Sequence, residues 1–192
     1  MRATAETYYE ALFSFVKGIR VTDARGGMLS FHEGIEGAGG LILAQAAKGR
    51  KVVFIGNGGS ASISSHMAID FWKNGRIKAV SFNDGPMLTC LGNDFGYGYV
   101  FEKPIEMFSE PGDVLVAISS SGRSENILRG VKMAQSKGCR VITLSGFQQD
   151  NPLSSLGEYN FYVPSQSYGP VEVIHHSICH CMMDGILKVR NG

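Results

Sequence analysis

Charge is scarce in this sequence of 192 residues, and its two signs are nearly balanced. Asp, Glu, Lys and Arg make up 18% of the residues, and 18 basic against 17 acidic side chains give a formal net charge of +1. This composition excludes a strongly basic nucleic-acid surface, an acidic tail and disorder driven by charge. Apolar residues make up 44%, which is enough for a hydrophobic core. At this length we expect one domain over residues 1–192.

Long apolar runs and cysteine motifs are also missing. No apolar run approaches the roughly 20 residues that cross a bilayer, and the N-terminus lacks the apolar stretch of a signal peptide. The four cysteines form neither a Cys-x-x-Cys pair nor a zinc-ribbon spacing. We therefore expect reduced thiols, a cytoplasmic protein, and neither a membrane nor a nucleic-acid partner.

Glycine, in contrast, is abundant. The chain has 25 glycines, nearly twice the average share of about 7%, whereas its six prolines are ordinary. Collagen and proline-rich linkers are therefore excluded. The excess indicates either unusually tight turns or places where backbone closely approaches a ligand or another element.

The hydrophobic pattern divides the chain into an N-terminal helical pair (1–48) and an α/β core (49–192). The pair comprises helices at 4–20 and 29–48 around a polar break at 22–27, and we expect the glycines of the second helix to allow close helix–helix packing. In the core, strands are predicted at 51–55, 77–82, 113–119, 140–145 and 159–163, with helices at 60–73, 97–108, 124–137 and 171–189. This alternation predicts a doubly wound, five-stranded parallel sheet in the flavodoxin-like order 2-1-3-4-5.

Two loops are candidates for binding an anion. They follow the first and third predicted strands, which flank the point where the strand order reverses and where ligands bind in such sheets. Glycines and serines at helix starts let backbone N–H and hydroxyl groups surround a phosphate, although each loop alone is also compatible with a tight turn and an N-cap serine. The candidate ligands are Asn57, Gly58, Gly59, Ser60, Ser119, Ser120, Ser121 and Ser124. Since neither nucleotide-binding glycine motif is present, we expect one small phosphate on a polar body.

Histidines and carboxylates gather in two short stretches. His66 and Asp70 share one face of a predicted helix, and the last helix contains Glu172, His175, His176 and His180. Such residues suit a zinc-type site, although a His–Asp pair is also a common hydrogen-bonded surface pair. Helical spacing favours His176 with His180, one turn apart. Glu172 and His180 lie about 12 Å apart along a helix. They would share an ion only if Glu172 preceded the regular helix or came from another subunit.

Several segments together resemble a known family. They are GNGGSA at 56–61, His66-x-x-x-Asp70, GNDFG at 92–96, GDVLVAISSSGRS at 112–124, VITLSG at 141–146 and EVIHHSICH at 172–180. They resemble the SIS (sugar isomerase) fold, and within it the phosphoheptose isomerases. The resemblance implies a homotetramer with active sites at subunit interfaces. It also implies conversion of sedoheptulose 7-phosphate to D-glycero-D-manno-heptose 7-phosphate, an early step toward bacterial lipopolysaccharide.

The resemblance also implies roles for individual residues. Ser119, Ser121 and Ser124 match phosphate-binding serines, Asn57 and Ser60 match substrate contacts, and Asp94 matches an acid near the sugar hydroxyls. His66, Asp70, Glu172 and His180 match the ligands of one Zn²⁺ per subunit. Asp70 or Glu172 would be the catalytic base of an enediol mechanism, and His180 the acid or electrophile.

Three positions depart from the family's pattern. Asp70 stands where the family has a catalytic Glu, Glu172 where it has a metal-binding Gln, and Gly169 where an active-site Asp is usual. These departures leave two alternatives open. One is an SIS isomerase for a different sugar phosphate. The other is a non-catalytic SIS protein of the type that binds a replication initiator, which the retained His66 and His180 disfavour.

Overall fold

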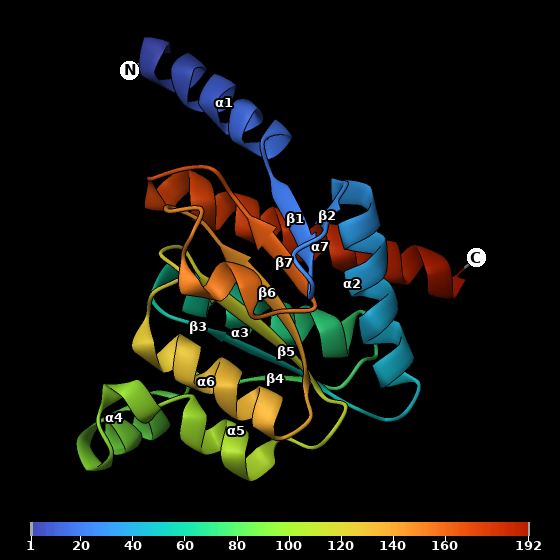
Figure 1. Ribbon diagram of the computed structural model, residues 1–192, viewed down its shortest axis with the longest axis vertical. Helices are drawn as coiled ribbons and strands as arrows, with labels where there is room; N and C mark the ends of the chain where they lie inside the picture. Colours follow the sequence, from blue (N-terminus) through green and yellow to red (C-terminus); the bar gives the residue numbers. More distant parts are fainter. Residues whose placement is uncertain (1, 192) are drawn as a thin grey trace.

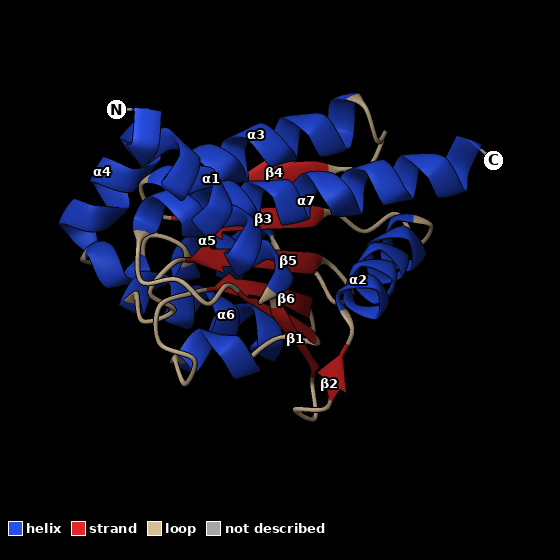
Figure 2. Cartoon of the chain, turned by 90° about the horizontal axis from the view of Figure 1, so that it is seen from above, coloured by secondary structure: helices blue, strands red, loops and turns tan. Residues whose placement is uncertain are grey.

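A mixed sheet organises the chain, of which the computed structural model describes residues 2–191. Within these residues seven strands join in the order β2-β1-β7-β6-β5-β3-β4, and the labelled strands succeed one another in this order in Figure 2. The parallel strands are β3 (Val52–Gly56), β4 (Ala79–Ser81), β5 (Val114–Ser119), β6 (Arg140–Ser145) and β7 (Tyr159–Tyr162). Counted along the chain, these five have the predicted order 2-1-3-4-5.

The predicted number of five strands is wrong, because the polar break at 22–27 contains a hairpin. Strands β1 (Arg20–Asp23) and β2 (Met28–Leu29) pair with each other, and β1 continues the sheet antiparallel to β7. The Asp23 carboxylate accepts hydrogen bonds from the N–H groups of Arg25 and Gly27, both at 2.8 Å, and so closes the turn. Only Val21 of β1 is fully buried, so these short strands carry too little apolar pattern to be recognised.

Helices cover both faces of the sheet (Figure 1). Alternate strand residues point to opposite faces. Val52 and Phe54 belong to one core with α2 (Phe31–Ala46), α3 (Gly59–Lys73) and α7 (Tyr168–Asn191). Val53 and Ile55 belong to a second core with α5 (Glu102–Phe108) and α6 (Glu125–Ser136). Two buried apolar layers therefore fix the positions of the strand ends.

One further helix lies where the sequence predicts none, and one predicted helix is shorter than expected. Helix α4 (Gly85–Asp94) begins at the N-cap Asp84, whose carboxylate accepts the N–H of Met87 at 3.2 Å. None of its described residues is fully buried, and Leu88 and Leu91 pack, partly buried, against the second core. This apolar face is too short for periodicity to reveal. The predicted helix 97–108 is a 3-10 turn at Tyr97–Tyr99 followed by α5.

The two N-terminal helices pack differently from expectation. Helix α2 lies against α7, whereas α1 (Arg2–Lys17) extends away from the body of the molecule (Figure 1). The glycines of α2 serve mainly helix-to-sheet rather than helix–helix packing. A Cβ on Gly34 would lie 2.6 Å from Cγ1 of Val21 on β1, and one on Gly37 would overlap the ring of Tyr159 on β7. Among the described helices, none is long and apolar enough to cross a membrane.

Candidate functional site

The first loop joins β3 to α3 and requires glycine. Gly58 is the N-cap of α3 and has φ +56°, a conformation that side chains disfavour. At Gly56 a Cβ would lie 2.5 Å from the carbonyl oxygen of Ser60, so the first turn of α3 closes directly on the strand end. The described part of α3 has no side-chain hydrogen bond at its N-cap. The backbone donors of this turn are therefore available to an anion.

The second loop joins β5 to α6 and lies beside the first, because β3 and β5 are parallel neighbours that pair Gly56 with Ile118. Gly122 has φ +61°, and a Cβ there would overlap the side chain of Asn151. Asn151 is buried and donates to the carbonyl oxygen of Gly146 and the hydroxyl of Ser145, each at 3.2 Å. This anchor fixes the shape of the serine loop.

The two loops line one polar cavity of about 210 Å³, which we call the serine pocket. Its lining residues are Asn57, Gly58, Gly59, Ser60, Ser119, Ser120, Ser121, Ser124, Tyr168 and Glu172. All eight loop residues predicted to bind phosphate are therefore brought together. Among the described lining residues, none is basic, and the buried hydroxyl of Ser120 has no hydrogen-bond partner. The loops thus offer neutral donors to an anion, whereas Glu172 adds a carboxylate to the lining.

An amide pair connects the two loops. Asn57 donates to Oδ1 of Asn126 at 2.9 Å, and Asn126 donates back to Oδ1 of Asn57 at 2.8 Å. The hydroxyl of Tyr97 adds a hydrogen bond to Asn57 at 3.2 Å. Asn126 is buried in the first turn of α6, so the starts of α3 and α6 are tied together.

Histidines from α3 and α7 meet beyond the serine pocket, and we call His66, His176 and His180 the histidine cluster. One ring nitrogen from each lies within 4.8 Å of the other two. Asp70 adjoins the cluster, with Oδ2 3.2 Å from Nε2 of His66 and 3.9 Å from Nδ1 of His180. Burial and the neighbouring His180 and His66 lower the pKa of His176. His176 is therefore favoured in the neutral form, in which an imidazole binds metal ions.

Three predicted residues lie apart from the cluster. Glu172 is inside α7, and its carboxylate packs against Gly59 in the serine pocket. Asp94 is exposed on α4, accepts a hydrogen bond from Asn93 at 2.9 Å and does not line the serine pocket. His175 is fully buried, with Nε2 3.0 Å from the carbonyl oxygen of Ser145. Burial lowers the pKa of His175 to about 4, so this histidine is neutral and structural.

Comparison with known proteins agrees with this architecture. The sequence profile of the SIS domain matches residues 28–146. The phosphoheptose isomerase of Fusobacterium nucleatum is 32% identical over 147 residues, which are 74% of this chain and 75% of that protein. The one of Aquifex aeolicus is 34% identical over 151 residues, which are 76% of this chain and 78% of that protein. This chain belongs to the phosphoheptose isomerase family of SIS-domain proteins.

Its fold matches that family over nearly the whole chain. The structure of the phosphoheptose isomerase from Neisseria gonorrhoeae superposes with a TM-score of 0.83 at 28% identity. The match covers 96% of this chain and 98% of that one. Helix α1 and strand β1 precede the matched profile, and the match over nearly the whole chain shows that they belong to the architecture shared with that structure.

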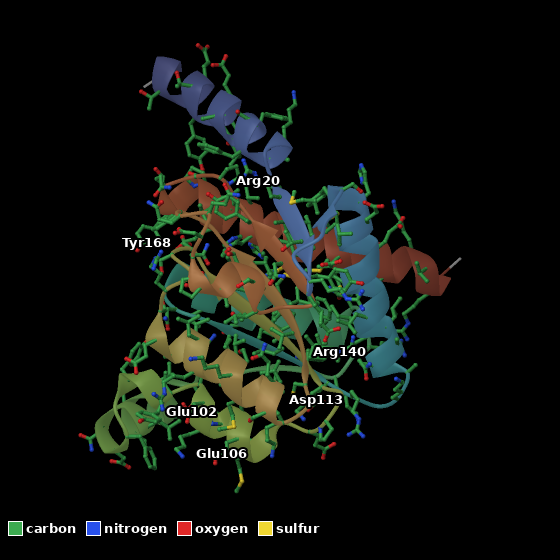
Figure 3. The ribbon with its side chains drawn as sticks, viewed as in Figure 1. Arg20, Glu102, Glu106, Asp113, Arg140 and Tyr168 are labelled. Carbon is green, nitrogen blue, oxygen red and sulfur yellow. The ribbon has the colours of Figure 1, made fainter. Side chains whose placement is uncertain are left out.

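Two residues at the site were missing from the predicted set. Tyr168 is the first residue of α7 and lines the serine pocket. Figure 3 shows it well apart from Asp113, which immediately precedes β5. An exposed aromatic before a Gly-Pro step gave no signal of this role. His176 was noted for its spacing from His180 but was not among the predicted metal ligands, and the structure places it between His66 and His180.

Proposed function

We propose that this protein is a ketose–aldose isomerase that converts sedoheptulose 7-phosphate to D-glycero-D-manno-heptose 7-phosphate, on the route to bacterial surface polysaccharide. One observation carries the proposal. A neutral, donor-rich pocket at two helix N-termini lies beside a carboxylate, Glu172, on the helix that also supplies His176 and His180. Phosphate recognition and proton-transfer groups are thus held on one rigid frame.

The serine pocket binds the phosphate in this proposal. The hydroxyls of Ser119, Ser121 and Ser124 and the backbone N–H groups at the starts of α3 and α6 donate to its oxygens. The hydroxyl of Ser120, which has no hydrogen-bond partner in the described structure, supplies a further donor. Because phosphate is held at one end, the open-chain sugar extends from the pocket along α7.

Asp70 is the base. Its Oδ2 lies 3.9 Å from Nδ1 of His180, whereas the Glu172 carboxylate lines the serine pocket with the phosphate, at the far end of the sugar from C1 and C2. Asp70 removes a proton from C1 of the ketose to form the enediol and returns it to C2. His180 assists transfer of the hydroxyl proton from O1 to O2. No other reactant is consumed, since the reaction only moves two hydrogens within the sugar.

The donor set beside the pocket fits a zinc ion. Zn²⁺ is bound by imidazole nitrogens and carboxylate oxygens, and the buried Nε2 of His176 has no hydrogen-bond partner among the described residues. His66, Asp70 and His180 would hold the ion, one per subunit. When bound, zinc supplies Lewis acidity toward a substrate oxygen.

The test is turnover of sedoheptulose 7-phosphate by the wild type, Asp70→Asn, His180→Gln and His32→Gln. His32 is an exposed histidine on α2, outside the serine pocket and the histidine cluster. We expect Asp70→Asn and His180→Gln to lose about 10²–10⁴-fold in kcat, the usual contribution of a positioned acid or base, and His32→Gln to keep wild-type activity. A wild-type protein that isomerises no ketose phosphate would refute the proposal.

A different sugar phosphate is the second candidate substrate, because of Asp94. This residue was expected near the sugar hydroxyls but is exposed on α4, and Gly169 adds no side chain to the site. The two candidate substrates are separated by assaying a panel of ketose phosphates of five to seven carbons. Each is assayed with the wild type and, as reference, with the serine-pocket variant Ser121→Ala. A higher kcat/KM for another ketose phosphate would replace sedoheptulose 7-phosphate as substrate.

The proposal includes a cytoplasmic homotetramer with active sites at subunit interfaces. Helix α1 supports it, because α1 leaves the body of the molecule while Tyr9 and Phe13 are 61% and 68% exposed. Light scattering during size-exclusion chromatography should give four times the 20.7 kDa mass of the chain. Phe13→Glu should produce smaller species, and a monomeric wild type would refute this part.

A further inference from the structure

Helix α7 carries three metal-binding side chains in a row. Glu172, His176 and His180 follow one another at four-residue intervals, so each is about one turn, or 5.4 Å, from the next. Because α7 begins at Tyr168, Glu172 belongs to the regular helix and not to the segment before it. Glu172 and His180 are therefore about 12 Å apart along one axis, which makes a shared ion within one subunit unfavourable.

Glu172 is also directed to a different place. Its carboxylate lies so close to Gly59 that a Cβ on that glycine would be 2.5 Å from Cδ of Glu172. It lines the serine pocket, where the start of α3 provides a favourable electrostatic environment for a negative charge. Among the described residues, the group whose donor atoms converge within 4.8 Å consists of His66, His176 and His180. Asp70 adjoins this group, with Oδ2 3.2 Å from Nε2 of His66, whereas the Glu172 carboxylate packs against Gly59 instead.

His176, the middle residue of the three on α7, lies next to both His66 and His180. Its ring centroid is 4.8 Å from that of His66 and 4.6 Å from that of His180. Its Nε2 is buried without a hydrogen-bond partner, an arrangement that costs free energy unless a ligand satisfies it. Ligand atoms of a tetrahedral zinc ion are about 3.4 Å apart, so small side-chain rotations would bring the three nitrogens together.

We infer that this chain binds a divalent metal ion through His66, His176 and His180, with Asp70 as the accompanying carboxylate, and that Glu172 is not a ligand. Three neutral imidazoles and one carboxylate leave a divalent ion with a net charge of +1, whereas adding Glu172 would neutralise it. The inference rests on the proposed function for the role of the ion in the reaction, but metal binding itself is measured without substrate.

The experiment titrates the full-length protein with Co²⁺, whose visible absorption reports the ligand field, and then measures displacement by Zn²⁺. The variants are His176→Gln, Glu172→Ala and, as a matched loss of one imidazole elsewhere, His32→Gln. Alanine is used at position 172 because a glutamine there could itself bind the ion. We expect one ion per chain in the wild type and at least a tenfold weaker Kd in His176→Gln, since even outer partners of metal ligands contribute about 10–100-fold. Glu172→Ala and His32→Gln should retain the wild-type Kd within about twofold and the wild-type cobalt spectrum.

Two results would overturn the inference. One is an unchanged Kd and spectrum in His176→Gln, and the other is a Glu172→Ala variant, with ligands from either subunit removed, that binds metal as weakly as His176→Gln. His176→Leu provides a second variant if the glutamine protein folds poorly, and circular dichroism of each metal-free variant checks the fold. Metal binding with these ligands but without isomerase activity would refute the proposed function while leaving the inference intact.

Discussion

Replacing Gly59 with alanine separates the position of the Glu172 carboxylate from the stability of the fold. Gly59 is the first residue of α3 and its φ is not positive, so alanine suits the backbone. The new Cβ would lie 2.5 Å from Cδ of Glu172. The carboxylate must therefore withdraw by about 1 Å to reach an ordinary contact of 3.4 Å. The clash involves the flexible end of a side chain, so the carboxylate moves and the helix stays.

The expected effects on activity and stability have opposite signs. The Glu172 carboxylate lines the pocket that positions the substrate, and a misplacement of about 1 Å in such a site can cost about 100-fold in rate because the near-attack geometry is lost. Alanine is a better helix residue than glycine by up to about 1 kcal/mol, so the free energy of unfolding should stay the same or rise. For a chain of this size, 1 kcal/mol corresponds to about 2–4 °C in Tm.

The assay measures kcat/KM for sedoheptulose 7-phosphate and Tm on the same preparations. Gly40→Ala is the matched control, because Gly40 lies within α2 and a Cβ there meets nothing within 4 Å. It should raise Tm by a similar small amount and leave kcat/KM unchanged. Wild-type kcat/KM in Gly59→Ala would refute a role of the Glu172 carboxylate in positioning the substrate. A large fall in Tm would instead show that the carboxylate cannot withdraw and that Gly59 is required for folding.

Three further predictions concern folding and the thiols. Gly56→Ala should destabilise the protein by about 1–3 kcal/mol in urea unfolding, since its Cβ meets the rigid backbone of α3 rather than a side-chain end. Asp113→Asn should lower the free energy of unfolding by about 3 kcal/mol, because the buried carboxylate pairs with the ammonium of Lys51 at 2.5 Å. The double variant with Lys51→Met should lower it by less, because no unpaired charge is then left behind. A thiol reagent should modify exposed Cys90 in the folded protein but should reach buried Cys179 only after unfolding. Burial also raises the pKa of the Cys179 thiol to about 12. Modification of Cys179 in the folded protein would contradict the packing of α7.

The parallel core was predictable because its strands are continuous apolar runs. Both faces of β3 and β5 are covered by helices, so every residue from Val52 to Ile55 is buried and the pattern is unmistakable. The loops that line the serine pocket were predictable for a related reason. Their glycines adopt conformations that other residues avoid, and the strand order places both loops at one edge.

The rest depends on contacts distant in the sequence. Strand β1 exists because β7 offers it an edge, and α4 buries none of its described residues completely, so neither leaves a periodic pattern. Spacing alone could not predict that Glu172 lines the serine pocket. It does not show where α7 begins or that Gly59 leaves room for a carboxylate. The position of His176 between His66 and His180 likewise requires the packing of α7 against α3.

The reciprocal amide pair of Asn57 and Asn126 has a thermodynamic consequence for the ligand. Because each amide both donates to and accepts from the other, the two loops cannot separate without breaking two hydrogen bonds at once. The conformational entropy of ordering the anion site is therefore lost during folding and not during binding. Phosphate should bind with little structural rearrangement, and the affinity for the sugar should reflect its own contacts along α7.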